Sequence, residues 1–531
     1  MTRETGATKA SPLRVTLVAG LALFLVTSAV SAQEPSRPSG PPAGTPETQT
    51  PAGPTAPPLD PTRPGVPSPP VDVPIRTTPD APPTIFVPPP TIPSARRPDI
   101  LAPGPSPLST GRIFTPHLGV TAAEGYSDNF NLSSTDRQSN FRTTLSPSIG
   151  VDINGAFTKG LVSYTLSAAY DTSRSSNGVE IFHALAESVT WYPTPLLTLT
   201  LTDSLTRSDE PTQADRLGLR RERQTFLSNL FGANATYFLG PINFGLVYQL
   251  STFFGNESSD TISHNVGATV GTTFYETNSV NFGYTFLLSD TSASSSVSTG
   301  TQSNEEITGH SFTASYSRKL TSLLTGGISG TYAIRRSNLP AGSNLSTGVG
   351  SGLASGNDYD LWTISLFNSY SAGPFSMTGS LGYSQVNPTH GQSESTPYTA
   401  TTIAYRFAKA VATLSVDSGF AETFSGGENF GVVETRGVQG TLLYPLTPFL
   451  STLLTAHYRV NSGQRGVEDQ HTWGATAALN FQLTRWLTLT AEYSHTEWSG
   501  GTFRSATGAN SGSTGGDVAE NRGRISLSAG F

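Results

Sequence analysis

The 531-residue sequence contains no cysteine. Disulfide bonds, cysteine-ligated zinc, iron–sulfur clusters, covalently attached c-type haem and a lipid-modified cysteine anchor are therefore excluded. Charged residues are also scarce, at 13%, against about 25% in typical soluble proteins. Hydrophobic residues make up only 36%, and no basic block indicates a nucleic-acid partner. This composition suits strands that face lipid on one side and small polar groups on the other.

The sequence also lacks, after its first segment, any apolar run approaching the roughly twenty residues of a spanning helix. That first segment, residues 15–26, follows Arg3, Lys9 and Arg14 and precedes the small residues Val30-Ser-Ala32. A basic start, a short apolar core and an A-x-A-like exit predict a secretory signal peptide at residues 1–32. Any later membrane crossing must therefore use strands.

Proline is concentrated in one segment, from Pro35 to Pro107, with runs such as Pro88-Pro-Pro90. Because proline has no amide donor and a fixed φ, we expect residues 33–112 to form a disordered periplasmic tether. At about 3.1 Å per residue it reaches on the order of 200 Å. It is either a passive spacer or an arm that contacts peptidoglycan or a periplasmic protein.

Residues 113–531 repeat one alternating pattern. Ile242-Asn-Phe-Gly-Leu-Val-Tyr-Gln-Leu-Ser251 reappears as Val280-Asn-Phe-Gly-Tyr-Thr-Phe-Leu-Leu-Ser289, with apolar side chains at every second position. Soluble strands usually run about five or six residues. Alternation over about 9–11 residues instead matches a tilted strand that crosses a bilayer.

Short turns alternate with long polar loops, and the long loops lie at 127–140, 209–222, 292–304, 338–357, 388–395 and 500–516. This asymmetry is typical of outer-membrane barrels, with the short turns and both ends in the periplasm. We predict an all-β fold, a single antiparallel transmembrane β-barrel of about 20 strands (about 18–22). The predicted strands are 115–126, 141–155, 160–172, 179–191, 196–208, 224–238, 241–254, 261–276, 279–291, 306–319, 322–336, 359–371, 374–386, 397–407, 409–423, 430–444, 449–462, 469–482, 486–498 and 517–531.

Two residues oppose this scheme. Pro147 removes a ladder donor from the second strand, so we expect a bulge there. Asp203 shares the outward face with Leu201 and Leu205, where a carboxylate is costly. Either a bulge turns Asp203 inward, or it lies above the lipid band.

The faces opposite the apolar rows would line the lumen. The candidate lumen-lining residues are Arg142, Asp152, Asp171, Arg335, Asp417, His457, Arg459, Arg522 and Arg524. They form either a hydrophilic conduit that slightly favours anions or sugar hydroxyls, or a solvated wall that only keeps a pore wet. The Gly/Ser-rich loop 338–357 is a candidate for constricting it.

Signs of catalysis are few. The eight histidines are scattered singly, at positions 117, 183, 264, 310, 390, 457, 471 and 495. His495 and Glu497 share one face, as a metal site or hydrolase dyad requires, but also as polar residues above a lipid band do. Gly-x-Gly spacings fall within strands, outside any phosphate-binding context. We therefore expect no catalytic, metal or cofactor site and no enzyme.

The last strand carries Ile525, Leu527, Ala529 and Phe531 on one face. An alternating strand that closes on a phenylalanine resembles the signal read by the assembly machinery of Gram-negative outer-membrane barrels. That machinery and outer-membrane lipid are the expected partners, and nucleic acid is not. We expect this strand to close the ring by pairing with residues 115–126.

The first predicted hairpin carries a family resemblance, in Tyr126-Ser-Asp-Asn129 and Ser146-Pro-Ser-Ile149. It resembles uncharacterised porin-type outer-membrane β-barrels, some of which resemble proteins of exopolysaccharide (exosortase-type) loci. The likeness covers one hairpin closely and the rest only by pattern, and the long proline segment departs from it. It implies outer-membrane passage or surface-polymer export, and assigns no functional residue.

Together these observations predict a porin-like channel in the outer membrane of a Gram-negative bacterium. It would pass small hydrophilic solutes by diffusion or serve surface-polysaccharide export. The alternative is a structural or docking protein of the envelope whose barrel holds the proline-rich arm.

Overall fold

The computed structural model describes residues 113–173, 178–210, 223–255, 260–292, 305–338, 358–389, 392–422, 432–462, 469–500 and 517–531. Within these ranges, no helix is long and apolar enough to cross a membrane. The signal peptide expected at residues 1–32 and the tether expected at 33–112 lie outside the described residues, as do most of the long loops.

The described residues form twenty strands. Every predicted strand is confirmed, with ends that differ from the prediction by at most three residues. The strands are β1 (Phe114–Ser127), β2 (Asn140–Asn154), β3 (Thr158–Asp171), β4 (Val179–Thr194), β5 (Leu197–Ser208), β6 (Phe226–Leu239), β7 (Ile242–Gly255), β8 (Asp260–Phe274), β9 (Asn278–Ser292), β10 (Glu305–Lys319), β11 (Leu324–Ser337), β12 (Tyr359–Ala372), β13 (Phe375–Pro388), β14 (Glu394–Arg406), β15 (Val411–Glu422), β16 (Val432–Thr447), β17 (Leu450–Ser462), β18 (Gln470–Thr484), β19 (Leu487–Gly500) and β20 (Val518–Gly530).

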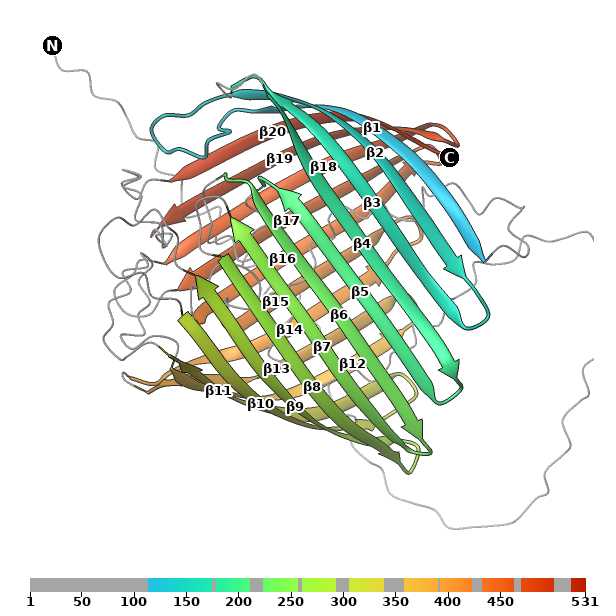
Figure 1. The fold of residues 1–531 in the computed structure, drawn as a ribbon, viewed down its shortest axis with the longest axis vertical. Coiled ribbons are helices and arrows are strands. Elements are labelled where there is room, and N and C mark those ends of the chain that lie inside the picture. Colours follow the sequence, from blue (N-terminus) through green and yellow to red (C-terminus); the bar gives the residue numbers. More distant parts are fainter. Residues whose placement is uncertain are drawn as a thin grey trace, which may run out of the picture. The chain divides into compact units, whose positions relative to one another are not determined.

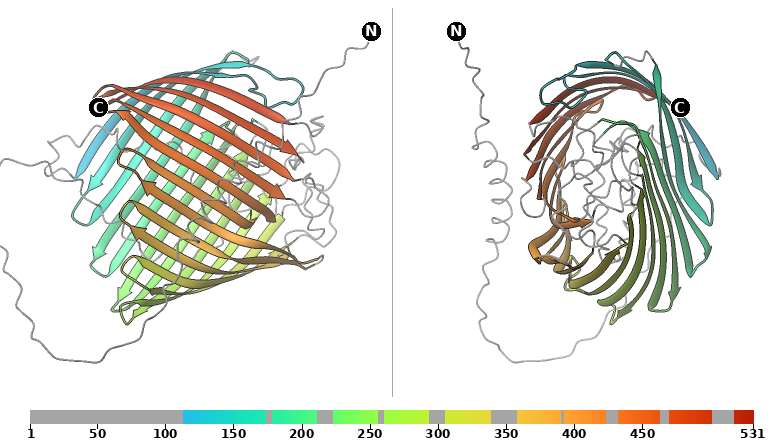
Figure 2. Two further views of the ribbon diagram at one scale, coloured as in Figure 1. Left: turned by 180° about the vertical axis from the view of Figure 1, so that it is seen from behind. Right: turned by 60° about the vertical axis from the view of Figure 1, so that its left-hand side comes forward.

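These strands close into one antiparallel β-barrel. Each strand pairs with its neighbours in sequence, and β1 pairs with β20 from Gly119↔Gly530 to Ser127↔Arg522 (Figure 1). The predicted all-β barrel and its predicted seam are therefore confirmed. Figure 2 shows the strands running obliquely around the ring. Closure leaves no strand with an unpaired edge.

The barrel has two different ends. At the short-turn end, two to four residues join most strand pairs, as at β6–β7 and β12–β13. Gly240 and Gly373 take φ values of 59° and 55° in these two turns, a left-handed conformation that glycine adopts without strain. The other end is the long-loop end, where β1 joins β2 and β5 joins β6.

The two faces of the wall differ in chemistry. One face carries the exposed apolar rows, with Leu246, Leu366 and Leu381 each more than 60% exposed. The other face carries bonds that skip strands, such as that from Arg335 of β11 to Glu422 of β15. Such bonds form only across the concave side of a closed sheet. The apolar rows therefore face outward, and the polar face lines the interior.

The bulge expected at Pro147 is wrong. β2 keeps one register along β3, and only the pairs of Ser146 and Pro147 are missing from that ladder. On the other side Pro147 pairs with Val120 of β1 without a shift. The ladder is interrupted there because proline has no N–H, but the strand absorbs the gap without an extra residue.

The bulge expected to turn Asp203 inward is also wrong, and the alternative that Asp203 lies above the lipid band stays a prediction. No register shift turns it inward, since it lies directly opposite Glu187 in the regular β4–β5 ladder. Glu187 is four residues from the exposed Trp191 and four from His183, so this row lies well within the outward face. The Asn229 side chain donates a 2.7 Å hydrogen bond to the Asp203 carboxylate. That bond replaces part of the hydration that an outward carboxylate loses.

Candidate functional site

A loop folds into the barrel at the long-loop end. Residues 128–139, here called the inward loop, connect β1 with β2. Leu132 of this loop is buried and packs with Trp498 of β19 and Val518 of β20. The Asn129 side chain, fully buried, donates to the Ala519 carbonyl at 2.9 Å. These contacts hold the inward loop against the inner wall.

Phe130 is the centre of the inward loop. Two guanidinium groups lie over its ring, with the Arg142 and Arg223 Cζ atoms 5.1 and 4.5 Å from the ring centroid. The Arg223 Nε also donates to the Phe130 carbonyl at 2.9 Å. A cation over a desolvated ring stabilises more than an exposed one does. The two arginines therefore hold the loop at Phe130.

The two arginines belong to a larger group, which we call the anchor cluster. Its members are Arg142, Asp171, Asp209, Glu210, Arg223, Glu520 and Arg522. Arg142 of β2 contacts Asp171 at 2.7 Å and Asp209 at 2.6 Å, and both aspartate side chains are only 2% exposed. It makes two bonds to each carboxylate, an arrangement that the planar guanidinium favours.

The second half of the anchor cluster joins β20 to the ends of β5 and β6. Arg522 contacts Glu210 at 2.6 Å and Glu520 at 2.8 Å. Arg223 contacts the same two carboxylates at 3.1 and 3.2 Å. Burial alone would raise the pKa of Glu210, but Arg522 and Arg223 outweigh it and lower that pKa to about 2. The cluster is therefore fully ionised at neutral pH around Glu210.

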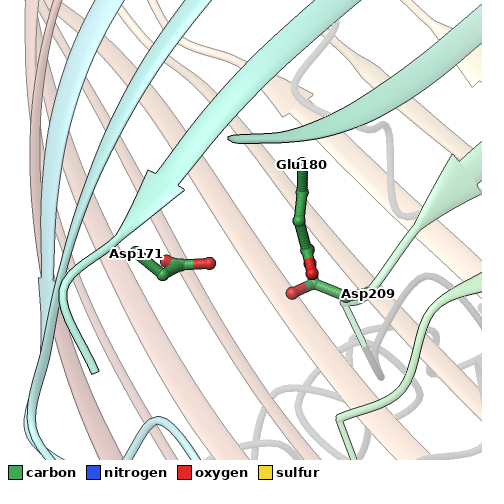
Figure 3. Close-up of side chains that lie close together, drawn as sticks. All are labelled: Asp171, Glu180 and Asp209. Carbon is green, nitrogen blue, oxygen red and sulfur yellow. The ribbon is translucent and has the colours of Figure 1, made fainter. Parts of the chain in front are cut away.

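Three carboxyl groups approach one another beside Arg142 (Figure 3). The oxygens of Asp171, Glu180 and Asp209 all lie within 4.8 Å of one another. Arg142 supplies the positive charge that both aspartates bind. The group is therefore part of the anchor cluster and holds β2, β3 and β5 together.

A second group of contacts closes the opposite part of the interior. The Arg335 Nη2 donates to Glu422 at 2.8 Å, and the fully buried Tyr359 donates its hydroxyl to the same carboxylate at 2.6 Å. We call these three residues the latch. Apolar side chains pack behind it, namely Leu287, Ile307, Ala333, Leu361, Val386 and Val432. The latch fills the corner between β9–β13 and β15–β16 near the long-loop end.

The interior differs between its two ends. Toward the long-loop end, hydroxyl pairs link neighbouring strands inside the wall, among them Ser263–Ser289 at 2.7 Å and Thr261–Thr291 at 3.4 Å. Toward the short-turn end, inward hydroxyl residues such as Ser376 and Thr378 of β13 are exposed. The interior is thus polar and accessible from the short-turn end and filled by side chains near the long-loop end.

The residues selected from sequence fall into several groups. Arg142, Asp171 and Arg522 meet in the anchor cluster, and Arg335 forms the latch. The others are separate. Asp417 bonds Arg459 at 3.2 Å, Asp152 bonds His117 at 2.8 Å, His457 lies against Gly474, and Arg524 is exposed on β20. The loop 338–357, a candidate for constricting the lumen, lies outside the described residues except for Asn338.

Several key residues were not found from sequence. Phe130, Asp209, Glu210, Arg223, Tyr359, Glu422 and Glu520 carry the two groups of contacts. Of these residues, only Phe130 could have been selected from sequence, because it is an aromatic residue within a polar loop.

His495 and Glu497 lie on the outward face. Their closest side-chain atoms are 3.9 Å apart, His495 bonds Asn521 at 2.8 Å, and Glu497 accepts from Trp473 at 2.9 Å. Both residues thus join β18, β19 and β20 at the long-loop edge of the wall.

No protein-family model matches the chain, and no curated protein matches it by sequence. Solved structures similar to it include the siderophore receptor PirA from Acinetobacter baumannii, at 10% identity and a TM-score of 0.43, covering 78% of this chain and 80% of that one. The ferric enterobactin receptor PfeA from Pseudomonas aeruginosa, in complex with enterobactin, matches at 11% and 0.44, covering 78% and 81%. The outer-membrane protein OpdK from Pseudomonas aeruginosa matches at 10% and 0.35, covering 78% and 99%. Likenesses this low carry nothing about the ligand or solute of this chain.

Proposed function

We propose that the protein is an outer-membrane channel that passes small hydrophilic solutes by diffusion and is narrowed at its long-loop end. The observation that carries the proposal is the inward loop, which the anchor cluster fixes on the inner wall at the long-loop end. A barrel that only holds another segment in the membrane needs no such loop. A conduit does, because a narrowing selects what passes.

The outward face supports membrane insertion. Exposed aromatics such as Trp191, Trp486 and Phe531 lie near the short-turn end, and Tyr164 and Tyr493 lie nearer the long-loop end. Along β4, eight residues separate Trp191 from His183. That distance is about 26 Å along the strand and about 20 Å at a tilt of about 40°. It is close to the roughly 25 Å apolar band of outer-membrane barrels, and the aromatic rows match interfacial girdles.

Single-channel recording from the full chain in planar bilayers tests the proposal. Discrete conductance steps are expected, and Phe130→Ala should enlarge them because the inward loop then loses the ring that the guanidinium groups of Arg142 and Arg223 cover. Phe157→Ala is the matched control, since Phe157 is 66% exposed at the short-turn end. It should leave the steps unchanged. Silence of the well-folded wild-type protein in all salts would contradict the proposal.

Export of a surface polymer is the second use of the same conduit, favoured by the resemblance of the first hairpin. It predicts that long neutral oligosaccharides block the channel reversibly from the short-turn side. The docking alternative instead assigns function to residues 35–107. Deleting them should leave conductance intact for a channel and abolish envelope attachment for a docking protein.

A further inference from the structure

Six hairpins repeat one contact on the outward face near the long-loop end. In each hairpin, a tyrosine on the odd-numbered strand bonds a polar side chain on the following strand. That side chain lies two residues closer to the long loop than the residue directly opposite the tyrosine. Tyr164, for instance, faces Leu185 and bonds His183. The pairs are Tyr164–His183, Tyr248–His264, Tyr284–His310, Tyr332–Asp360, Tyr458–His471 and Tyr493–Asn521, at 2.7, 3.0, 2.9, 3.0, 2.9 and 2.8 Å. We call these twelve residues the tyrosine belt.

The donor of the hydrogen bond is fixed in two of the six pairs. The Asp360 carboxylate and the Asn521 carbonyl oxygen can only accept, so Tyr332 and Tyr493 must donate. The four histidine pairs have the same geometry, with Nδ1 as the bonded atom. A tyrosine that donates to Nδ1 leaves the imidazole proton on Nε2. In that tautomer, His183, His264, His310 and His471 of the belt each present an Nε2–H donor.

Arginines lie in the same rows as the belt. Arg207, exposed on β5, is directly opposite His183. Arg436, whose side chain is 60% exposed, contacts Glu434 at 2.6 Å and lies in one row with Val460 and His471. Arg336 is 48% exposed and contacts Asp360 at 3.0 Å. Among the described residues, Arg207 has no carboxylate partner. A cation beside an N–H donor, as at Arg207 and His183, matches an anion with several acceptor oxygens.

We propose that the tyrosine belt binds the phosphate groups of membrane lipids in the leaflet on the long-loop side, most strongly at His183 and Arg207. This inference rests on the membrane insertion of the proposed function, but not on conduction. In this arrangement the tyrosine rings lie at the membrane–water interface, and the histidine N–H groups and the arginines point to the headgroup layer. The lipid chains cover the leucines on the membrane side of the belt. A guanidinium binds phosphate through two parallel N–H bonds, and the histidine adds a third.

Lipid retention by the purified full chain tests this inference. Native mass spectrometry from micelles that contain equal amounts of phosphatidylglycerol and a neutral glycosyl diacylglycerol of the same chain length counts the lipids that stay bound. Wild type should retain the phosphate lipid in preference. The double variant His183→Phe, Arg207→Ala should lower that preference about threefold to tenfold, the range for losing one or two charge-assisted bonds.

Two variants serve as matched controls. His457→Phe alters a histidine of the inner face, and Arg318→Ala an exposed arginine at the short-turn end. Neither should change lipid preference. Equal retention of both lipids by wild type would overturn the inference, and so would displacement of phosphatidylglycerol by millimolar inorganic phosphate, because the site would then take free phosphate. An unchanged lipid preference in the double variant would show that His183 and Arg207 are not part of the lipid site. If the protein does not conduct in bilayers but still retains phosphatidylglycerol in preference, the proposed channel is contradicted and the lipid site of the tyrosine belt is supported.

Discussion

At the scale of single residues, Arg142 combines two buried carboxylate partners with an aromatic ring. It neutralises two aspartates that are each 2% exposed, and it lies over Phe130. A buried ion pair gains little over apolar packing, but removing one partner leaves a buried charge without compensation. The effect of substituting Arg142 should therefore far exceed that of substituting a surface arginine.

Arg142→Ala is expected to destabilise the barrel by about 3–5 kcal/mol. Arg142→Lys should fall between wild type and alanine, because lysine restores the charge without the bonds to both aspartates. The measurement is the urea midpoint of unfolding in micelles, followed by tryptophan fluorescence. Arg436→Ala, at a side chain 60% exposed, should change stability by about 0–1 kcal/mol. Equal midpoints for Arg142→Ala and Arg436→Ala would contradict this account.

Residue pairs were the least predictable part of the molecule. The outward or inward side of a residue follows from its parity within a strand, and Arg142, Arg335 and Arg522 were selected in this way. Of their partners only Asp171 was selected as well, because Asp209, Glu422 and Glu210 come from strands or loops distant in sequence. The tyrosine belt was missed for a related reason. A diagonal pair requires the register of each hairpin, which single histidines do not reveal.

At the scale of elements, strands and loops differ in how far sequence determines them. Strand positions were predictable to within three residues because alternation and turn chemistry recur in every hairpin. Pro147 and Asp203 show the limit of that reasoning. Each breaks a local preference, yet the neighbouring strands hold the register through the rest of the ladder. The path of the inward loop depends on contacts with β19, β20 and Arg223, so its own residues could not predict it.

The inward loop should resist acid down to an unusually low pH. The pKa of Glu210 is lowered from 4.5 to about 2, so its contribution to the anchor cluster is complete above about 4.5 and is lost as the pH falls through about 2. Single-channel conductance is expected to stay constant from pH 7 to pH 4 and to rise only as the pH approaches 2. Glu210→Gln should show the larger conductance already at pH 7, without a further step. Opening of the wild-type channel near pH 5 would show that another group controls the loop.

At the scale of the whole barrel, the seam between β1 and β20 decides whether the ring closes. Nine residue pairs join these strands, fewer than in the ladders on either side. Phe531 extends the seam beyond β20. Its N–H donates to the Leu118 carbonyl at 2.8 Å, its carbonyl accepts from the Leu118 N–H at 3.1 Å, and its ring stacks on Trp486 with centroids 6.0 Å apart. The last residue thus ties the first strand to the last and to β19.

Deleting Phe531 should therefore impair assembly and leave the conduit unchanged. The deletion removes two backbone hydrogen bonds and one aromatic stack at the short-turn end, whereas the inward loop and the latch lie near the other end. The fraction of chains that become folded in lipid vesicles, seen by their heat-dependent mobility on gels, should fall severalfold. Molecules that do insert should conduct as wild type does.

Phe531→Tyr keeps both the backbone bonds and the ring, and should restore the folded fraction. Phe531→Gly keeps only the backbone hydrogen bonds, so its folded fraction separates their contribution from that of the aromatic ring. Wild-type assembly of the deletion itself would show that β1 and β20 close without this residue.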